Sequence, residues 1–304
     1  MSDRPLLVLG SMNVDLFARV HRLPGAGETV GGAELTRRFG GKGANQALAA
    51  ALQGATVRML GCVGSDGEGR AYREHLRRAG VDDSLVLSAA GHPTGTAFIT
   101  LDKHGENQIV VVPGANGAVS EQQVLAASAE IAAAGALLAQ WEVPTPAMAA
   151  AFTIAARQRV PVIFNPSPLQ TDFPWGRWSL AALIVNETEA LQLCGTSEPA
   201  AWAAARARLG VETLIVTRGA ASTWVCAGEG SFEVPTLKVA PLDTVGAGDA
   251  FAGTFAARRC EGASLRSAVA AANCAGALAT QAIGAQESLP SRGAVEEALR
   301  SLSL

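Results

Sequence analysis

The residues best suited to chemistry form one short segment, Asp243-Thr244-Val245-Gly246-Ala247-Gly248-Asp249, which leads directly into a predicted helix. Glycines let a backbone turn sharply and approach a ligand closely. The first N–H groups of a helix lack intrahelical partners and the helix dipole adds positive potential, so this turn suits an anion such as phosphate. Asp249 could then take the proton from a hydroxyl group that attacks phosphorus. A helix-capping role is the alternative, and this segment alone does not decide between the two.

A second glycine-rich segment, Gly40-Gly41-Lys42-Gly43-Ala44-Asn45, also precedes a predicted helix. Its free backbone N–H groups and the amide of Asn45 could contact a ligand with many hydroxyl groups. The segment is not a Walker A loop, because glycine follows Lys42 and the glycine spacing differs. A tight strand-to-helix turn without a binding role is the alternative interpretation.

Other polar residues follow apolar runs that predict strands. Asn186 and Glu189 could orient water around a magnesium ion that carries nucleotide phosphates, or they could form an ordinary capping box. Residues 217–222 could lie along a nucleotide or form a plain hairpin turn. Glu142 ends a predicted strand and could hold sugar hydroxyl groups.

The elements that must position these residues are strands alternating with helices along most of the chain. This order predicts an α/β fold with three layers, in which a mostly parallel central sheet is flanked by helices. Ligands in such folds bind at the carboxyl ends of the strands. The polar residues above follow predicted strands, as do Asn13 and Asp15 after the first strand, so we expect one shared site.

Two segments, 14–40 and 94–112, interrupt this alternation with short strands and tight turns. We expect them to form one small antiparallel β-sheet that covers the site as a lid. Residues 1–13, 41–93 and 113–304 are then expected to form the α/β catalytic domain. An exposed apolar face on the lid sheet could also pair two chains.

Composition excludes several classes of protein. The net charge of −3 and the lack of a basic block argue against a nucleic-acid partner. The five cysteines are scattered without a CxxC pair, and the four histidines show no metal-ligand spacing. The first apolar run, residues 6–10, is too short for a signal peptide or a membrane span. These features lead us to expect a cytoplasmic protein with no membrane partner.

Together these segments resemble the ribokinase-like (PfkB) carbohydrate kinase family, and the ribokinases within it most closely. The similarity runs nearly the whole length and rests on motifs in family order at residues 10–15, 27–30, 40–47, 105–107, 113–116, 140–144, 186–189 and 243–249. It implies transfer of the γ-phosphate of ATP to the 5-hydroxyl of D-ribose, giving D-ribose 5-phosphate. It also implies a homodimer.

The resemblance implies a role for each site residue. Asp249 is expected to be the base, with an anion hole formed by the N–H groups of Gly246, Ala247 and Gly248. The sugar-binding residues are expected to be Asn13, Asp15, Gly41, Lys42, Gly43, Asn45, Glu142 and Asp249. The ATP site is expected to contain Asn186, Glu189, Thr217, Arg218, Gly219, Ser222, Gly248 and Asn273.

Two metal ions are implied as well. Glu189 is expected near Mg2+, through water, and K+ is expected beside the anion hole. The K+ ligands, mostly backbone carbonyls, are expected from Asp243, Val245, Ala279, Ala282, Gly284 and Ser288.

Four residues depart from the family pattern: Ser222, Val245, Asn273 and Glu287. Ser222 and Asn273 put the nucleotide contacts in doubt, and Glu287 replaces a proline beside the expected cation. Two other functions stay open. One is phosphorylation of another pentose, deoxyribose or a nucleoside. The other is a sugar-binding regulator without catalysis, which the intact Asp249 and glycine turn argue against.

Overall fold

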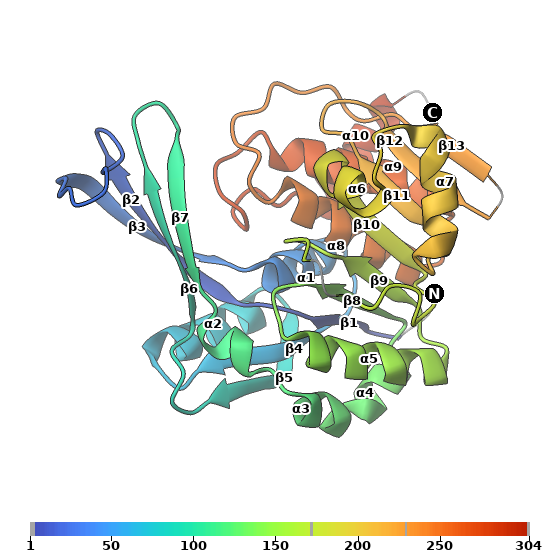
Figure 1. Ribbon diagram of the computed structural model, residues 1–304, viewed down its shortest axis with the longest axis horizontal. Helices are drawn as coiled ribbons and strands as arrows, with labels where there is room; N and C mark the ends of the chain where they lie inside the picture. The colour runs from blue at the N-terminus through green and yellow to red at the C-terminus, as the bar shows by residue number, and fades with distance from the viewer. Residues whose placement is uncertain (1–3, 171–172, 229, 303–304) are drawn as a thin grey trace.

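The computed structural model describes residues 4–170, 173–228 and 230–302. The predicted domain ends, residues 1 and 304, lie outside these ranges. A nine-stranded sheet crosses the molecule in the order β13-β12-β11-β10-β9-β8-β1-β4-β5 (Figure 1). Its strands are β1 (Leu6–Leu9), β4 (Val57–Gly64), β5 (Val81–Ala89), β8 (Ala136–Gln140), β9 (Val162–Asn165), β10 (Ala182–Asn186), β11 (Leu214–Thr217), β12 (Thr223–Ala227) and β13 (Gly230–Val234).

The prediction of a mostly parallel sheet is confirmed. Every neighbouring pair from β5 to β11 is parallel, and β12 and β13 add an antiparallel edge. Two edge strands, β5 and β13, were not predicted. In β5 the polar residues Asp82 and Asp83 interrupt the apolar run that marks a buried strand. Because β1 lies between β4 and β8, the strand order reverses there, which is where α/β sheets bind ligands.

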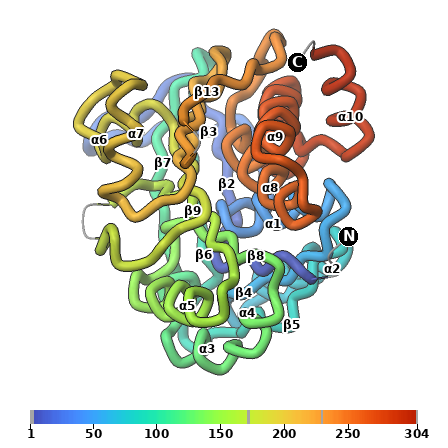
Figure 2. The backbone as a smooth tube through the Cα atoms, turned by 90° about the vertical axis from the view of Figure 1, so that its right-hand side faces the viewer, coloured from blue at the N-terminus to red at the C-terminus, as the bar shows by residue number. Residues whose placement is uncertain are grey.

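Helices cover both faces of this sheet (Figure 2). One face is covered by α1 (Lys42–Leu52), α2 (Gly67–Arg78), α8 (Ala247–Cys260), α9 (Leu265–Ala279) and α10 (Arg292–Ser301). The other is covered by α3 (Glu121–Ala126), α4 (Ser128–Ala133), α5 (Thr145–Gln158), α6 (Glu187–Cys194) and α7 (Pro199–Arg208). The predicted helix over 120–133 is therefore two short helices, and a 3₁₀ helix (Gly114–Ala118) precedes them.

The period-2 geometry of strands produces two separate hydrophobic cores. In β1, Leu6 and Val8 join the core under α8 and α9, whereas Leu7 and Leu9 join the core under α5. A strand that must be apolar on both faces explains the unbroken apolar run in the sequence. No helix among the described residues is long and apolar enough to cross a membrane.

A second sheet projects from one side of the molecule (Figure 1). It has the order β3-β2-β6-β7, with strands β2 (Asn13–Val20), β3 (Gly32–Gly40), β6 (Gly95–Leu101) and β7 (Asn107–Val112). The small sheet is thus confirmed, and its outer pairs, β2–β3 and β6–β7, are antiparallel as predicted. The central β2–β6 pair is parallel instead, so the sheet is mixed. Both strands leave the main body in the same direction, and two such strands can only pair in parallel.

Candidate active site

A cavity of about 730 Å³ lies between the small sheet and the carboxyl ends of the main strands. Its walls contain both sheet residues such as Phe17 and Ile99 and the starts of α1 and α8. The predicted site residues that line it are Asn13, Asp15, Gly41, Lys42, Asn45, Glu142, Asn186, Glu189, Thr217, Asp243, Val245, Gly246, Gly248, Asp249 and Gly284. A cavity of this volume is in the range that holds small-molecule ligands.

Other predicted residues lie outside this lining, namely Gly43, Ala247, Arg218, Gly219, Ser222, Asn273, Ala279, Ala282 and Ser288. Gly43 instead allows α1 to start against the end of β1, because a Cβ atom there would lie 2.4 Å from the backbone nitrogen of Ser11. Ala247 begins α8. The close approach at Gly43 brings the α1 backbone next to Glu142.

Glu142, after β8, meets the end of β1 at the point where the strand order reverses. Its Oε2 accepts a hydrogen bond from the hydroxyl group of Ser11 and another, at 3.1 Å, from the backbone N–H of Lys42. Beside it, Asn13 Oδ1 accepts a 2.7 Å hydrogen bond from Asn116. Asn13 and Glu142, from separate parts of the chain, are thus held by hydrogen bonds where they line the cavity.

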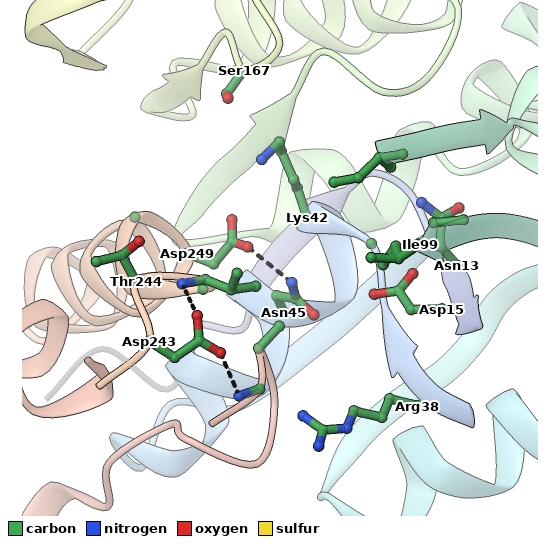
Figure 3. A pocket seen from close by; sticks show the side chains of 18 of the residues that line it. Asn13, Asp15, Arg38, Lys42, Asn45, Ile99, Ser167, Asp243, Thr244 and Asp249 are labelled. Atoms are coloured by element: carbon green, nitrogen blue, oxygen red, sulfur yellow. Dashed lines mark hydrogen bonds between the residues drawn. The ribbon is translucent and has the colours of Figure 1, made fainter. Parts of the chain in front are cut away.

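Asp249 is buried at the start of α8, and both of its carboxylate oxygens accept hydrogen bonds. Asn45 Nδ2 donates to Oδ2 at 2.9 Å and Gln46 Nε2 donates to Oδ1 at 2.9 Å (Figure 3 shows the first). The N-cap of α8 is Gly246, with a φ of 79° and no side-chain capping bond. Asp249 therefore does not cap the helix, and the capping alternative is excluded.

The surroundings of Asp249 favour the binding of an anion. The negative charge of Asp249 raises the pKa of the nearby Lys42 amine, so Lys42 keeps its positive charge in the cavity. The space beside Gly248 is open, because a Cβ atom on that residue would meet nothing within 4 Å. A base, a cation and the start of a helix thus share one space, where the N–H of Ala247 already donates to the carbonyl of Thr244 at 3.4 Å.

Asp15, which lines the cavity, has a strongly raised pKa. Burial, followed by the charges of Glu142 and Glu287, raises its pKa from 3.8 to about 7. Asp15 lies on β2 directly opposite Arg38 of β3. Such a raised pKa is common where function keeps a carboxyl group in a costly place.

The predicted nucleotide side shows a mixed outcome. Asn186 and Glu189 form a complete capping box at the start of α6, so the capping interpretation is confirmed. Both residues also line the cavity, and the box uses only Oε2 of Glu189. Thr217 lines the cavity and donates its hydroxyl proton to the carbonyl of Val185.

Arg218 and Asn273 have structural partners instead. The Arg218 guanidinium donates to the carbonyl of Ser222 at 2.7 Å and lies over the ring of Trp224. Asn273 is buried in α9, where it accepts from Thr223 and donates to the carbonyl of Val234. Both side chains hold the β12–β13 edge, away from the cavity lining.

The segment around Asp243 and the loop after α9 are joined by hydrogen bonds. Asp243 Oδ1 accepts from the N–H of Val245 and Oδ2 accepts from the N–H of Gly284, each at 3.0 Å (Figure 3). Ser288 donates to the carbonyl of Gly284. A Cβ atom on Gly246 would lie 2.8 Å from the carbonyl oxygen of Ala285. The loop therefore packs directly against the turn that starts α8.

Three residues at the site were missed by the sequence reasoning: Ser11, Gln46 and Gln286. Gln46 directly contacts Asp249, and Gln286 contacts Asn45. Ser11 and Gln46 stand inside motifs that carry the resemblance, and Gln286 precedes Glu287, one of the departures from the family pattern, so their polar type and position were available as a signal. Among the described residues no group of three or more His, Cys, Asp or Glu side chains could hold a metal ion.

Comparison with known proteins agrees with this geometry. The model of the pfkB family carbohydrate kinases matches residues 3–292. Ribokinase of Haemophilus influenzae is 35% identical over 294 residues, covering 95% of this chain and 96% of the relative. Ribokinase of Staphylococcus aureus is 37% identical, covering 94% and 96%.

Solved structures extend the likeness to three dimensions. Arabidopsis thaliana ribokinase complexed with ribose and ATP superposes with a TM-score of 0.91 at 31% identity, covering 98% of this chain and 99% of that one. Ribokinase of Thermotoga maritima superposes with a TM-score of 0.88 at 32% identity, covering 98% and 99%. The chain belongs to the pfkB family of carbohydrate kinases.

Proposed function

We propose that this protein is a ribokinase, which transfers the γ-phosphate of ATP to the 5-hydroxyl of D-ribose and gives D-ribose 5-phosphate. One observation carries the proposal. The carboxylate of Asp249 is held by two amides at the start of α8, inside a cavity that is also lined by the polar side chains of Asn13, Asp15 and Glu142. The choice of D-ribose as the substrate is supported by the similarity of this chain to ribokinases.

In this mechanism the sugar lies between the small sheet and α1, held by Asn13, Asp15, Glu142 and Asn45. Asp249 accepts the proton of the attacking hydroxyl as the oxygen approaches phosphorus in line with the leaving group. The N–H groups of residues 246–248 stabilise the charge on the transferred phosphoryl group. Each group is already fixed before the reaction, which limits the reorganisation that the step requires.

The nucleotide is proposed to lie towards Asn186 and Thr217. Lys42, which was expected among the sugar-binding residues, is proposed to neutralise phosphate charge as well. Mg2+ bound to the phosphates neutralises their charge during transfer. Glu189 fits a water-mediated role there, because its second oxygen is not used by the capping box. Gly219, Ser222 and Asn273 are proposed to contact the part of the nucleotide that extends beyond the cavity lining.

A potassium ion is proposed beside the turn that starts α8. Backbone carbonyls would there replace the hydration shell of K+, and the ion would add positive charge near the anion hole. The segment at Asp243 and Val245 and the loop containing Ala282, Gly284 and Ser288 are proposed to hold this ion, because the Asp243 carboxylate joins the two segments through the N–H groups of Val245 and Gly284. Ala279, in the last turn of α9, would contribute its carbonyl.

Residues 14–40 and 94–112 are proposed to act as a lid, and residues 1–13, 41–93 and 113–304 as the catalytic domain. Closure excludes water, which would otherwise compete with the sugar for the phosphoryl group. A homodimer through the lid sheet is also proposed. The face away from the cavity carries cross-strand partners Phe98 and Val110, which are 49% and 62% exposed. Patches of this kind commonly mark an interface.

A cytoplasmic location completes the proposal, supported by five free cysteines and by the use of ATP. The test is turnover of ATP with a panel of D-ribose, other pentoses, deoxyribose and nucleosides. We expect the highest kcat/KM with D-ribose and a 5-phosphate product by NMR. A higher value for another member of the panel would reassign the substrate, and sugar binding without turnover would indicate a regulator.

A further inference from the structure

Four side-chain amides form two arms that reach the Asp249 carboxylate. In the first arm, Gln286 Nε2 donates to Asn45 Oδ1 at 2.9 Å and Asn45 Nδ2 donates to Asp249 Oδ2 at 2.9 Å. In the second, Gln140 Nε2 donates to Gln46 Oε1 at 2.6 Å and Gln46 Nε2 donates to Asp249 Oδ1 at 2.9 Å. Each arm is an outer amide, an inner amide and the carboxylate.

The outer amide decides which end of the inner amide faces the carboxylate. A side-chain amide has a donating NH₂ end and an accepting oxygen end of nearly the same size. If the side-chain amide of Asn45 were flipped, its oxygen would face an Asp249 oxygen, and the two acceptors would repel each other. The N–H that Gln286 donates occupies the Asn45 oxygen and keeps the NH₂ end on Asp249.

The two arms differ in what holds them. Gln140 ends β8, and Gln46 also donates at 3.0 Å to Asn165, which ends β9. Both strands lie in the middle of the main sheet, so this arm is fixed by the core. Gln286 instead stands in the loop between α9 and α10. The first arm therefore depends on the position of a loop.

Two side chains of α2 fix the amide of Gln286 in turn. His75 Nε2 lies 2.7 Å from Gln286 Oε1, and Gln286 Nε2 also donates to the Tyr72 hydroxyl at 3.0 Å. The Tyr72 hydroxyl donates its own proton to the carbonyl of Gly40, so towards Gln286 it is an acceptor. Gln286 thus has its donor end directed at Asn45 and Tyr72 and its oxygen at His75.

We propose that Gln286 is a positioning residue for the base, acting through Asn45, and that it makes the orientation of Asp249 depend on the loop after α9. The proposal rests on the proposed function, in which Asp249 is the base. The same loop donates the Gly284 N–H to Asp243 and packs against Gly246. A shift of this loop therefore reaches the anion hole directly and the base through two hydrogen bonds.

The test replaces Gln286 by Glu, which has the same size but no N–H to donate. The Asn45 amide loses the bond that orients it, and the reacting groups are no longer aligned. We expect kcat with D-ribose to fall about 10- to 100-fold while KM for ATP stays at the wild-type value. Gln286→Met, which is neutral, is expected to give the same fall and covers the case in which the buried charge prevents folding.

Gln122→Glu is the matched control, since it makes the same chemical change at an exposed position of α3. It is expected to keep wild-type kcat. A double-mutant cycle then separates positioning from general loop support. In an Asn45→Ala background, Gln286→Met is expected to cause no further fall in kcat, because its effect passes through Asn45.

Wild-type kcat in both Gln286 variants would overturn the inference and leave the proposed function intact. An equal fall in the wild-type and Asn45→Ala backgrounds would also overturn it, because Gln286 would then act by another route. If the wild-type enzyme phosphorylated none of the sugars, both the proposed function and this inference would be wrong.

Discussion

The raised pKa of Asp15 predicts that this residue costs the protein stability at neutral and alkaline pH. Burial and the charges of Glu142 and Glu287 raise the pKa from 3.8 to about 7. Because the folded-state pKa lies above the unfolded one, the folded state binds the proton more tightly. The stability that this proton gives is fully present below about pH 4 and is lost as pH rises through about 7.

The magnitude follows from the difference between the two pKa values. One pH unit corresponds to about 1.4 kcal/mol, so the full cost above pH 7 is about 4 kcal/mol. At about pH 5 the cost in stability comes only from the interval between the unfolded-state pKa of 3.8 and pH 5, and it is about 1.6 kcal/mol. Asp15→Asn, which has the same shape and no charge, removes this cost. It should stabilise the protein by about 2.5 kcal/mol more at about pH 8 than at about pH 5.

The assay is urea unfolding of the sugar-free protein, followed by tryptophan fluorescence at both pH values. Glu297→Gln, at an exposed position of α10, is the control and should show no pH-dependent difference from wild type. The variant should bind D-ribose far more weakly, since the carboxylate is placed for the sugar rather than for stability. Equal stability differences at both pH values, or destabilisation at pH 8, would refute the reasoning.

Three further predictions concern the turn, the cation and the lid. Gly246→Ala should lower the free energy of unfolding by about 2–4 kcal/mol, because the new Cβ atom would meet the Ala285 backbone at a φ of 79°. Gly248→Ala should leave the free energy of unfolding unchanged, because the space beside Gly248 is open. Equal effects of the two variants in thermal melts would contradict this prediction. Turnover should be several-fold faster, and the melting temperature higher, in potassium than in sodium buffer, and identical values would remove the cation from the account. Val110→Glu should convert a dimer to a monomer in light scattering, and a wild-type monomer at working concentration would argue against the lid interface.

The layered fold could be predicted because its signal is local. An apolar run such as residues 6–10 must be buried on both faces, and strands alternating with helices lead to a parallel sheet. The strands at the sheet edges carried weaker signals, as in β5. The parallel pairing of β2 with β6 was missed for a different reason, because strand direction within the small sheet depends on how both segments leave the main body.

The chemistry at Asp249 could be anticipated from its type and its glycine turn, but its partners could not. Asn45 lies 204 residues away in sequence, and Gln46 lies 203 away. Only the fold brings them together, and the glycine-rich motif that contains Gln46 does not indicate which carboxylate this side chain contacts. Asn273 was expected at the ATP site, but the structure places it in the core. There its amide donates to the carbonyl of Val234 and accepts from the hydroxyl of Thr223.

The central claim is that Asp249 takes the proton of the attacking hydroxyl. Asp249→Asn keeps the side-chain size and removes the base, so it tests this role directly. In a single-turnover experiment with ATP and D-ribose, formation of the sugar phosphate should slow at least about 100-fold. D-ribose binding, measured by calorimetry, should largely survive. Phosphoryl transfer at close to the wild-type rate would contradict the account.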